Sequence, residues 1–408
     1  MAEEKLEQRL EAIQEEEGPE GVLRFCDEKL DELPKTAAKP RVWLKLQRLS
    51  ALISLKKFEI SDNDFENLTR NIESLDLSIR EQSLWKGRLF NIWGISLGSR
   101  GFFARAVEKY QLSHDQIVSV NPQQTATLSN IGLNLMYLGK WNAAHQVFLD
   151  GLRNTSADDL LGRAVLLTNH GELLRRWDKK DAQQNLEEAV ALNEKLGDNE
   201  GLAEAAHSLI RLFLDHSQPE KAESLIDRIR AIKPSPLEQY CQLFQLRIEG
   251  LWASANSQPE RAIGYYSSAL DLALEGLQEH ALGIQYDLAL IFLQEAVQGS
   301  SIALERLRIL LSQIVNFAEQ NNLLFILVET LMIQTKVVIY LQEYIPGFEL
   351  LVRINMLLEQ LPMDHLKSRV SDLERELTAL NPQSIVQQEA QMNVRDLQAY
   401  LEKYSKLA

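Results

Sequence analysis

Cysteine is nearly absent from this sequence of 408 residues, which contains only Cys26 and Cys241. Two thiols far apart in the chain exclude a framework of disulfides and favour a reducing compartment. The 7 histidines are scattered, and neither the His-Glu-x-x-His motif nor a cysteine pair at metal-binding spacing occurs. We therefore expect no metal site and no cofactor.

Basic residues are in deficit. The chain has 43 Lys and Arg against 58 Asp and Glu, a net charge of −15 and a pI of about 5.1. A surface that binds nucleic acid or anionic lipid must be basic, so neither partner is expected. Residues 1–32 hold 12 acidic and 4 basic side chains, a net of −8. They are expected to form either a solvated end of the fold or an acidic docking surface.

The chain also lacks a long uninterrupted hydrophobic run. The most apolar stretch, NLLFILVETLMIQTKVVIYL at 322–341, includes Glu329, Gln334 and Lys336, which are costly in lipid. We interpret it as a helix buried on most sides. The first residues, MAEEKLEQRLEAIQEEEG, have no apolar segment of the kind that a signal peptide needs. We expect a cytoplasmic protein.

Strand signals are weak as well. Aromatic residues account for 7% of the chain, and it has 19 Gly and 11 Pro. Polar and apolar residues do not alternate over long runs, whereas apolar residues recur at i, i+3 and i+4, as in AESLIDRIRAI. Short helix-breaking segments such as LPKTAAKP, LGDNEG and IKPSP lie between these stretches. The sequence therefore predicts an all-α fold with short turns.

A pattern of small and large residues repeats along the chain. Its four positions are a small residue, a glycine, an alanine and a large residue, spaced by 7, 5 and 4 positions. It occurs in full at Gly94, Gly101, Ala106 and Tyr110, and at Gly132, Gly139, Ala144 and Phe148. The alanine recurs at intervals of 38 to 41 residues, at Ala182, Ala222, Ala262 and Ala303. A period of this length predicts stacked helical hairpins.

This pattern resembles the tetratricopeptide repeat (TPR), and the resemblance is strongest over 83–275, where Pro234 also ends a unit. The units of about 38–44 residues are longer than the usual number of about 34. In length they are similar to the units of kinesin light chains and of bacterial sensor and regulator TPR modules. The resemblance implies a right-handed α-solenoid of about eight or nine TPR-like hairpins with a C-terminal helix.

Four segments are expected along this array. Residues 1–82 are degenerate N-terminal TPR-like hairpins with the acidic end, 83–275 are the core units, and 276–361 are longer TPR-like units. Residues 362–408 contain one helix to about Leu380, a break at Asn381–Pro382 and a final amphipathic helix. This last segment either caps the solenoid or contacts a partner.

Packing explains the glycines within these helices. The two antiparallel helices of a unit approach closely where a side chain is smallest, as at Gly132. Phe148, on the second helix, is expected to fill the gap against the next unit. Gly139 is expected to end the first helix in the left-handed conformation.

Catalytic motifs are weak. GISLG at 94–98 matches the Gly-x-Ser-x-Gly element of hydrolases, but Ser96 falls inside an expected helix rather than after a strand. DNDFENLTRNIE at 62–73 resembles a calcium-binding loop, but Asn67 replaces the glycine that the turn requires. Ser61 and Asp62 fit the start of a helix instead. No phosphate-binding or dinucleotide-binding motif occurs, and we expect neither enzyme activity nor a catalytic residue.

Binding residues are expected on the concave surface. In TPR proteins the first helix of each unit lines this groove, which receives an extended peptide or a partner helix. Amides both donate and accept hydrogen bonds, and arginines pair with carboxylates. Alternatively these side chains are solvated or form ion pairs within the array. By register, the expected partner-binding residues are Arg88, Asn91, Asn130, Tyr137, Asn169, Arg175, His207, Arg211 and Arg247.

Two functions remain open. The leading hypothesis is a non-catalytic scaffold or adaptor that binds a peptide or partner segment in the groove. The dicarboxylate clamp of chaperone-binding TPR proteins is not matched. The alternative is a regulatory subunit, or sensor, in which a peptide or protein ligand changes the superhelix and so controls a separate effector such as an enzyme or transcription factor. Only a sensor must change shape or oligomeric state when its ligand binds.

Overall fold

A computed structural model describes residues 2–55, 57, 60–118, 120, 126–235, 238–274, 278–361 and 364–380. Within these residues the chain is helical and contains no strand, which confirms the predicted all-α class. The helices are α1 (Ala2–Glu32), α2 (Ala38–Ser54), α3 (Asp62–Glu73), α4 (Ile79–Ser99), α5 (Phe103–Val118), α6 (Ala126–Tyr137), α7 (Trp141–Asn154), α8 (Leu160–Arg176), α9 (Ala182–Leu196), α10 (Asn199–Asp215), α11 (Pro219–Arg230), α12 (Gln239–Ala255), α13 (Pro259–Leu274), α14 (Gln278–Val297), α15 (Ser301–Gln320), α16 (Leu324–Tyr340), α17 (Tyr344–Leu358) and α18 (Asp364–Leu380).

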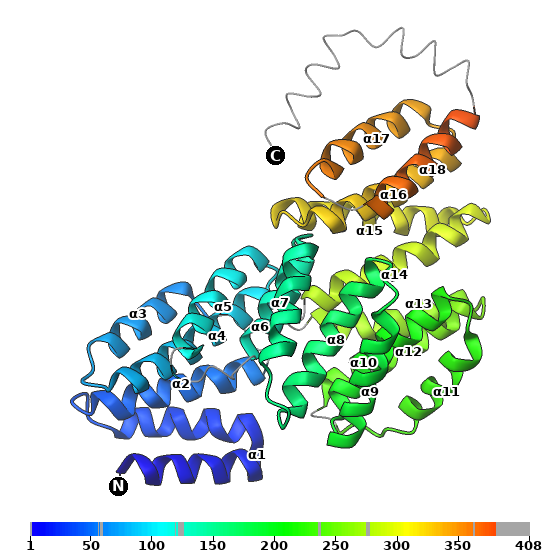
Figure 1. Cartoon of the computed structure of the whole chain (residues 1–408). Helices are drawn as coiled ribbons and strands as arrows, with labels where there is room; N and C mark the ends of the chain where they lie inside the picture. The colour runs from blue at the N-terminus through cyan, green and yellow to red at the C-terminus, as the bar shows by residue number, and fades with distance from the viewer. Residues whose placement is uncertain are drawn as a thin grey trace, which may run out of the picture.

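The helices form an α-solenoid of antiparallel hairpins (Figure 1). From α4 to α17, each even-numbered helix pairs with the odd-numbered helix that follows it. The even-numbered helices also contact one another from α6 to α18, and so line the inner face. Before them, α1 is divided at Gly18 (φ 65°) into two segments, and α2 and α3 follow. The described residues therefore hold nine helical pairs and α18, in agreement with the predicted eight or nine hairpins.

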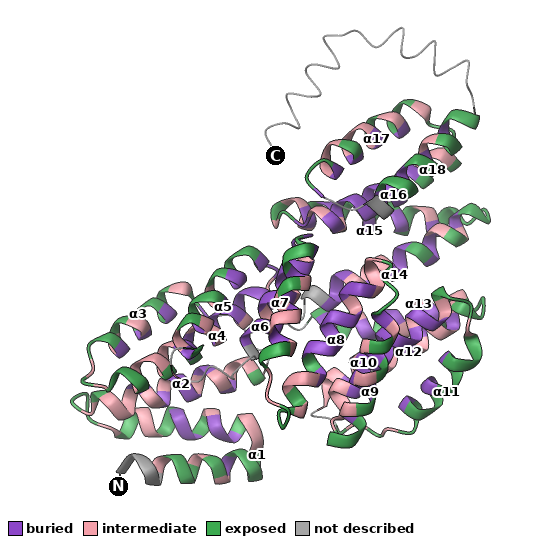
Figure 2. Ribbon diagram, in the orientation of Figure 1, coloured by how far each residue is buried: buried purple, intermediate pink, exposed green. Residues whose placement is uncertain are grey.

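The predicted alanine positions are buried, and each lies on the second helix of a hairpin. Their exposed fractions do not exceed 2%, at Ala106, Ala144, Ala182, Ala222, Ala262 and Ala303. Figure 2 shows that buried residues concentrate between the paired helices. These positions confirm that the period read from the sequence is the period of the packing.

A glycine of the first helix meets the large residue of the second. The Phe148 ring fills the space next to Gly132, and a Cβ on Gly94 would lie 2.6 Å from Tyr110. Phe148 also reaches the next hairpin, where its ring lies 5.7 Å from the ring of His170. Phe148 thus lies against the next hairpin, as expected, and it also packs against Gly132 of its own hairpin.

Left-handed residues close the hairpins at a regular interval. They are Gly101, Gly139, Asp178, Ser217 and Ser257, with φ between 55° and 84°, and then Gly299 and Gln342, with φ of 102° and 59°. After each of them, the next amide donates to a carbonyl five positions earlier, as from Lys140 to Leu135 (2.9 Å). The expectation for Gly139 is confirmed, and three of these turns use short polar residues in place of glycine.

The last hairpins fold back onto turns of earlier ones. Phe317 of α15 covers Gly101 and leaves no room for a Cβ. A Cβ on Gly139 would lie 2.7 Å from Leu361, and the rings of Trp141 and Phe325 are 4.6 Å apart. The superhelix thus brings α15 and α16 against the turns that precede α5 and α7.

Several local expectations are also met. Ser61 begins α3 by accepting a hydrogen bond from the Asp64 amide, and Ser96 is fully buried inside α4. Cys26 and Cys241 are buried free thiols.

In the described part of the chain, no helix has the length and apolar character needed to span a membrane. The predicted division into four segments stays a prediction, and the segment from Asn381 onward lies outside the described residues.

Two histidines form a partly buried contact between hairpins. Asn185 Nδ2 lies 2.9 Å from His170 Nδ1 and His145 Nδ1 lies 2.8 Å from His170 Nε2. If the Asn185 amide donates to Nδ1, His170 carries its proton on Nε2 and donates to His145. Burial, and secondarily the charge of His145, lower the pKa of His170 to about 4. Burial, and secondarily the charge of Lys179, also lower the pKa of His145, so folding favours the neutral form of both rings.

The free energy of unfolding is expected to fall between about pH 6.5 and pH 4 through this pair. In that window the unfolded chain binds a proton at His170 that the folded chain excludes, so protonation favours unfolding. Below the folded pKa both states bind the proton, and the free energy of unfolding stops falling for this reason. The free energy of unfolding would be measured by urea titration at several pH values across the window. Its dependence on pH should be weaker in His170→Asn than in wild type, by about one proton. His216→Gln, a change at an exposed histidine, is the control. An equal pH dependence of the free energy of unfolding in wild type and His170→Asn would contradict the prediction.

Candidate functional site

Polar side chains of neighbouring inner helices are joined at the repeat interval. Asn169 Nδ2 on α8 donates to Ser129 Oγ on α6 at 2.9 Å, and the two residues are 40 positions apart. Tyr240 on α12 and His280 on α14 are also 40 positions apart, with 2.8 Å between the hydroxyl and Nε2. The inner face therefore carries polar groups in rows that run from helix to helix.

The inner face is hollowed toward its C-terminal half. We call this cavity of about 390 Å³ the central hollow. It receives side chains from α6, α8, α10, α12, α14, α16 and α18. Its lining consists of Tyr137, Arg175, Arg176, Arg211, Asp215, Arg247, Leu251, Leu282, Gly283, Tyr286, Asp287, Leu290, Phe325, Ile326, Glu329 and Arg369.

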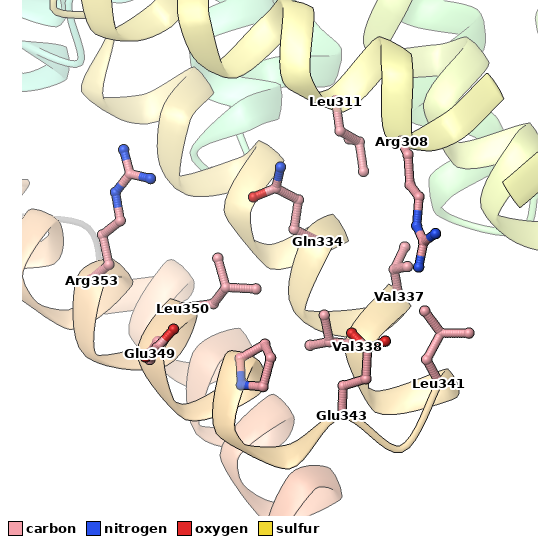
Figure 3. A pocket seen from close by; sticks show the side chains of 11 residues that line it. Arg308, Leu311, Gln334, Val337, Val338, Leu341, Glu343, Glu349, Leu350 and Arg353 are labelled. Carbon is pink, nitrogen blue, oxygen red and sulfur yellow. The ribbon is translucent and has the colours of Figure 1, made fainter. Parts of the chain in front are cut away.

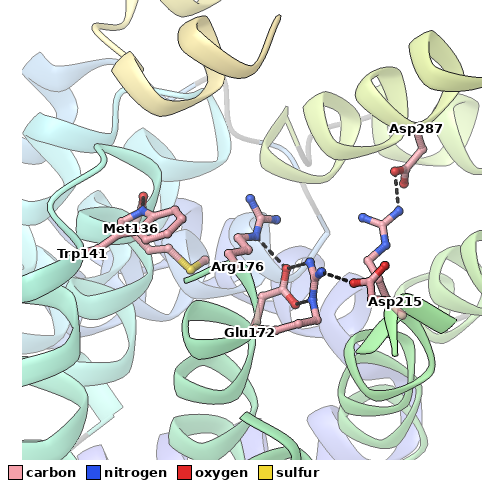
Figure 4. Close-up of polar contacts among 8 residues, drawn as sticks. Met136, Trp141, Glu172, Arg176, Asp215 and Asp287 are labelled. Carbon is pink, nitrogen blue, oxygen red and sulfur yellow. Dashed lines mark hydrogen bonds and ion pairs between the residues drawn. The ribbon is translucent and has the colours of Figure 1, made fainter. Parts of the chain in front are cut away.

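Glu172 of α8 binds two arginines at one side of the central hollow (Figure 4). Its carboxylate lies 2.9 Å from Arg175 Nε and 2.7 Å from Arg176 Nε. Arg175 also reaches Asp215 of α10 at 3.2 Å. Burial alone would raise the pKa of Glu172, but the two guanidinium groups outweigh burial and hold that pKa well below its usual range.

An ion pair crosses between two of the helices that line the central hollow. Arg211 of α10 bonds to Asp287 Oδ1 of α14, and α12 lies between these two inner helices in the order of the array. Asp287 is 4% exposed. Burial would lower the pKa of Arg211, but the charge of Asp287 outweighs it and raises that pKa. Figure 4 shows Asp287 directed at its arginine partner.

Three residues at intervals of 40 positions form what we call the polar row, on α10, α12 and α14. They are His207, Arg247 and Asp287, each at most 6% exposed. Each has a buried atom without a hydrogen-bond partner among the described residues: Nε2 of His207, Nε of Arg247 and Oδ2 of Asp287. Buried polar atoms are nearly always paired, so the alignment of three such atoms needs an explanation.

The C-terminal side of the central hollow has a second buried acid. Glu329 of α16 accepts a hydrogen bond from the Tyr286 hydroxyl at 2.5 Å, and its other oxygen binds Arg369 of α18. Burial raises the pKa of Tyr286, and the carboxylate of Glu329 adds to that effect. These contacts fix the position of α18 against α14 and α16.

Near the polar row, one acid carries no arginine partner among the described residues. Glu204 lies one turn before His207 on α10, and burial raises its pKa to about 7. Burial, with the charges of Arg247 and Arg211, lowers the pKa of His207 well below its usual range. Burial therefore disfavours the charged form of both side chains, and the two arginines further disfavour a positive charge on His207.

The central hollow unites four of the nine residues expected to bind a partner. These are Tyr137, Arg175, Arg211 and Arg247. His207 lies in the polar row beside it. The other four lie toward the N-terminal end of the inner face, where Asn130 bonds to Asn91 (3.4 Å) and Arg88 to Gln47 (2.7 Å), with Asn169 bonded to Ser129. Ligand binding by any of the nine stays a prediction.

Sequence reasoning missed the acids of the site. Asp287 and Glu329 determine where Arg211 and Arg369 point, and neither acid was expected at the groove. A signal for Asp287 was present, because it follows Arg247 by one repeat of 40 residues and so shares its register. Arg369 had no such signal, since it lies beyond the last predicted repeat.

A second hollow lies between α15, α16 and α17 (Figure 3). Its volume is about 340 Å³, and its walls are mainly Leu311, Val337, Val338, Leu341 and Leu350, with Arg308 and Arg353 at its edges. In the described chain, none of the buried unpaired polar atoms belongs to this second hollow. We therefore regard the central hollow as the candidate site.

Among solved structures, the chain is similar to a Rap protein complexed with Competence and Sporulation Factor. The TM-score is 0.57 at 13% identity, covering 91% of this chain and 97% of that one. Weaker likenesses are to the Rap conjugation gene regulator of plasmid pLS20 in complex with the Phr* peptide (TM-score 0.47, 13% identity, 92% and 94% covered) and to the apo quorum sensor NprR from B. thuringiensis (0.41, 15%, 81% and 97%).

No family model and no curated protein matches the sequence. At such low identity, the first structural likeness shows a shared helical-repeat fold of TPR type. The likeness in unit length to kinesin light chains stays a prediction.

Proposed function

We propose that this chain is a non-catalytic protein that binds a peptide or a partner segment at the central hollow. The polar row carries the proposal, because its three buried atoms lack partners within the described protein. An unpaired buried polar group destabilises a fold, and a ligand that supplies the missing partners removes that cost. An extended segment fits this surface, since the unpaired atoms follow one another from helix to helix.

The architecture supports a ligand of this kind. Inner helices of a solenoid form an extended concave surface, and the central hollow receives residues from seven of them. The Rap protein that shares this fold was solved as a complex with Competence and Sporulation Factor. A solenoid of this kind therefore admits a bound ligand.

One observation favours a sensor over a passive scaffold. Tyr137 and Phe325 line the same hollow although they belong to distant hairpins. Phe325 also packs against Trp141 at the start of α7. A ligand in the central hollow therefore touches both sides of the contact that closes the superhelix, and we propose that it shifts their separation and thereby controls a partner chain.

Leu290→Arg is expected to abolish ligand retention. Leu290 lines the central hollow and is 43% exposed, so a longer charged side chain obstructs the site at little cost to the fold. Leu274→Arg, at an exposed leucine of α13 outside the hollow (51% exposed), is the matched control. Immobilised wild type and both variants would be exposed to native cytosol, and retained peptides and proteins identified by mass spectrometry. Equal retention by Leu290→Arg and wild type would contradict binding at this site.

The same ligand separates sensor from scaffold. Addition of the retained species to wild type is expected to change the radius of gyration in solution X-ray scattering, because both sides of the hollow move. If the radius of gyration does not change when the ligand is bound at saturation, the sensor function is excluded and the scaffold function remains.

A further inference from the structure

Arg247 differs from the other arginines of the central hollow. Arg175, Arg176, Arg211 and Arg369 each bind a carboxylate, whereas Arg247 forms no ion pair within the described residues. It is only 6% exposed and its Nε has no hydrogen-bond partner. Its guanidinium carbon lies 5.2 Å from the centroid of the Phe244 ring.

A buried cation without a counter-ion is costly to the fold. Burial accordingly lowers the pKa of Arg247, and the nearby charge of Asp287 only partly opposes this effect. Asp287 does not neutralise Arg247, because it already binds Arg211. Glu204, the other acid on which the charge of Arg247 acts, forms no ion pair with it in the described part of the chain, and burial raises the pKa of Glu204 to about 7. The charge of Arg247 is therefore at most partly compensated by the described residues, although the chain as a whole has a net charge of −15.

The chemistry of the missing partner follows from these groups. The guanidinium group presents parallel N–H donors that match the two oxygens of a carboxylate. A single carboxylate supplies the one negative charge that the site lacks, whereas a phosphate dianion would exceed it beside the acids Asp287 and Glu329. Asp287 Oδ2 is an unpaired acceptor and requires an N–H group. A carboxylate beside a peptide amide meets both requirements.

We propose that Arg247 binds a carboxylate of the peptide ligand and that Asp287 Oδ2 accepts an N–H group next to it. The inference rests on the proposed function and specifies the ligand of that site. The carboxylate comes either from the C-terminus of the peptide or from an Asp or Glu side chain.

Three pools of random pentapeptides distinguish these sources. The first has free C-termini and no acidic residue, the second has amidated C-termini and no acidic residue, and the third has amidated C-termini and one Asp or Glu. Each pool would be tested with full-length wild type, Arg247→Met and the control Arg261→Met, by retention and by thermal melting. Arg261 is exposed on α13 and lies outside the hollow.

Wild type and Arg261→Met are expected to retain the first or the third pool about tenfold more than the second, as for one charge-assisted contact. The preferred pool identifies the source and raises the melting temperature. Arg247→Met is expected to lose this preference, yet to melt without ligand at or above the wild-type temperature, because it removes an unpaired buried charge. If that variant fails to fold, Arg247→Lys retains the charge without the planar donor pair and is expected to bind several-fold more weakly.

The outcomes separate the two levels of the proposal. Equal retention of all pools by wild type, or an unchanged preference in Arg247→Met, overturns the carboxylate inference and leaves peptide binding intact. Retention of none of the pools by wild type overturns peptide binding at the hollow, and the inference with it.

Discussion

Asp287→Leu is expected to lower the free energy of unfolding by about 3 to 5 kcal/mol, as for removal of one partner from a buried ion pair. Asp287 is 4% exposed and binds Arg211, whose own side chain is 19% exposed. The substitution leaves the guanidinium of Arg211 without its counter-ion. It also removes the acid whose charge partly stabilises the charged form of the neighbouring Arg247. Urea unfolding followed by circular dichroism measures the loss.

Two comparisons make this result specific. The double variant Arg211→Met/Asp287→Leu should regain most of the loss, because an apolar pair of similar volume replaces a buried ion pair at little cost. Asp227→Leu breaks an exposed pair with Arg230, with side chains 66% and 42% exposed, and should cost less than about 1 kcal/mol. A loss in Asp287→Leu as small as in Asp227→Leu would show that the crossing pair is not desolvated.

Gly132→Leu is expected to cost about 3 kcal/mol, the upper part of the range for overpacking. The Phe148 ring leaves no space for a Cβ at position 132, and both residues are buried. Leucine has a higher helix propensity than glycine, which offsets the loss by up to ~1 kcal/mol. The hairpin α6–α7 can accept the side chain only by moving apart. The measurement is again the urea midpoint and slope.

Gly264 provides the matched control. It lies in α13, and a Cβ at this position would have no neighbouring atom within 4 Å, so Gly264→Leu should be neutral or slightly stabilising through helix propensity alone. The double variant Gly132→Leu/Phe148→Ala should recover part of the loss, because the smaller side chain at position 148 leaves space for the larger one at position 132. Similar losses in Gly132→Leu and Gly264→Leu would contradict the packing argument.

The hairpin array was predictable because its packing is encoded locally. A close helix crossing requires a small residue on one helix and a large one on the other. Gly132 with Phe148 and Gly94 with Tyr110 meet that requirement in the sequence itself, at one fixed spacing. Turn positions were less visible. Asp178, Ser217 and Ser257 adopt positive φ, which short polar residues tolerate at modest cost, so no glycine marked these turns.

The site was only partly predictable, for a different reason. Register along the repeats placed Arg211 and Arg247 on the inner face, because helix periodicity determines which side of a helix a residue occupies. The pairing of Arg211 with Asp287 depends instead on how far the superhelix turns between α10 and α14. That turn is a sum of small rotations at each hairpin contact, and no single stretch of sequence encodes it.

The contacts of Phe317 with Gly101 and of Phe325 with Trp141 have a consequence for cooperativity. An array held together by nearest neighbours alone frays from its ends, one unit at a time. Here the loss of α15 and α16 would also uncover the turns before α5 and α7, far away in sequence. The statistical weight of a frayed C-terminal end is therefore reduced by contacts that a nearest-neighbour description omits. Local opening on either side of this closure is coupled to opening on the other, and the middle of the chain unfolds less independently than its repeats suggest.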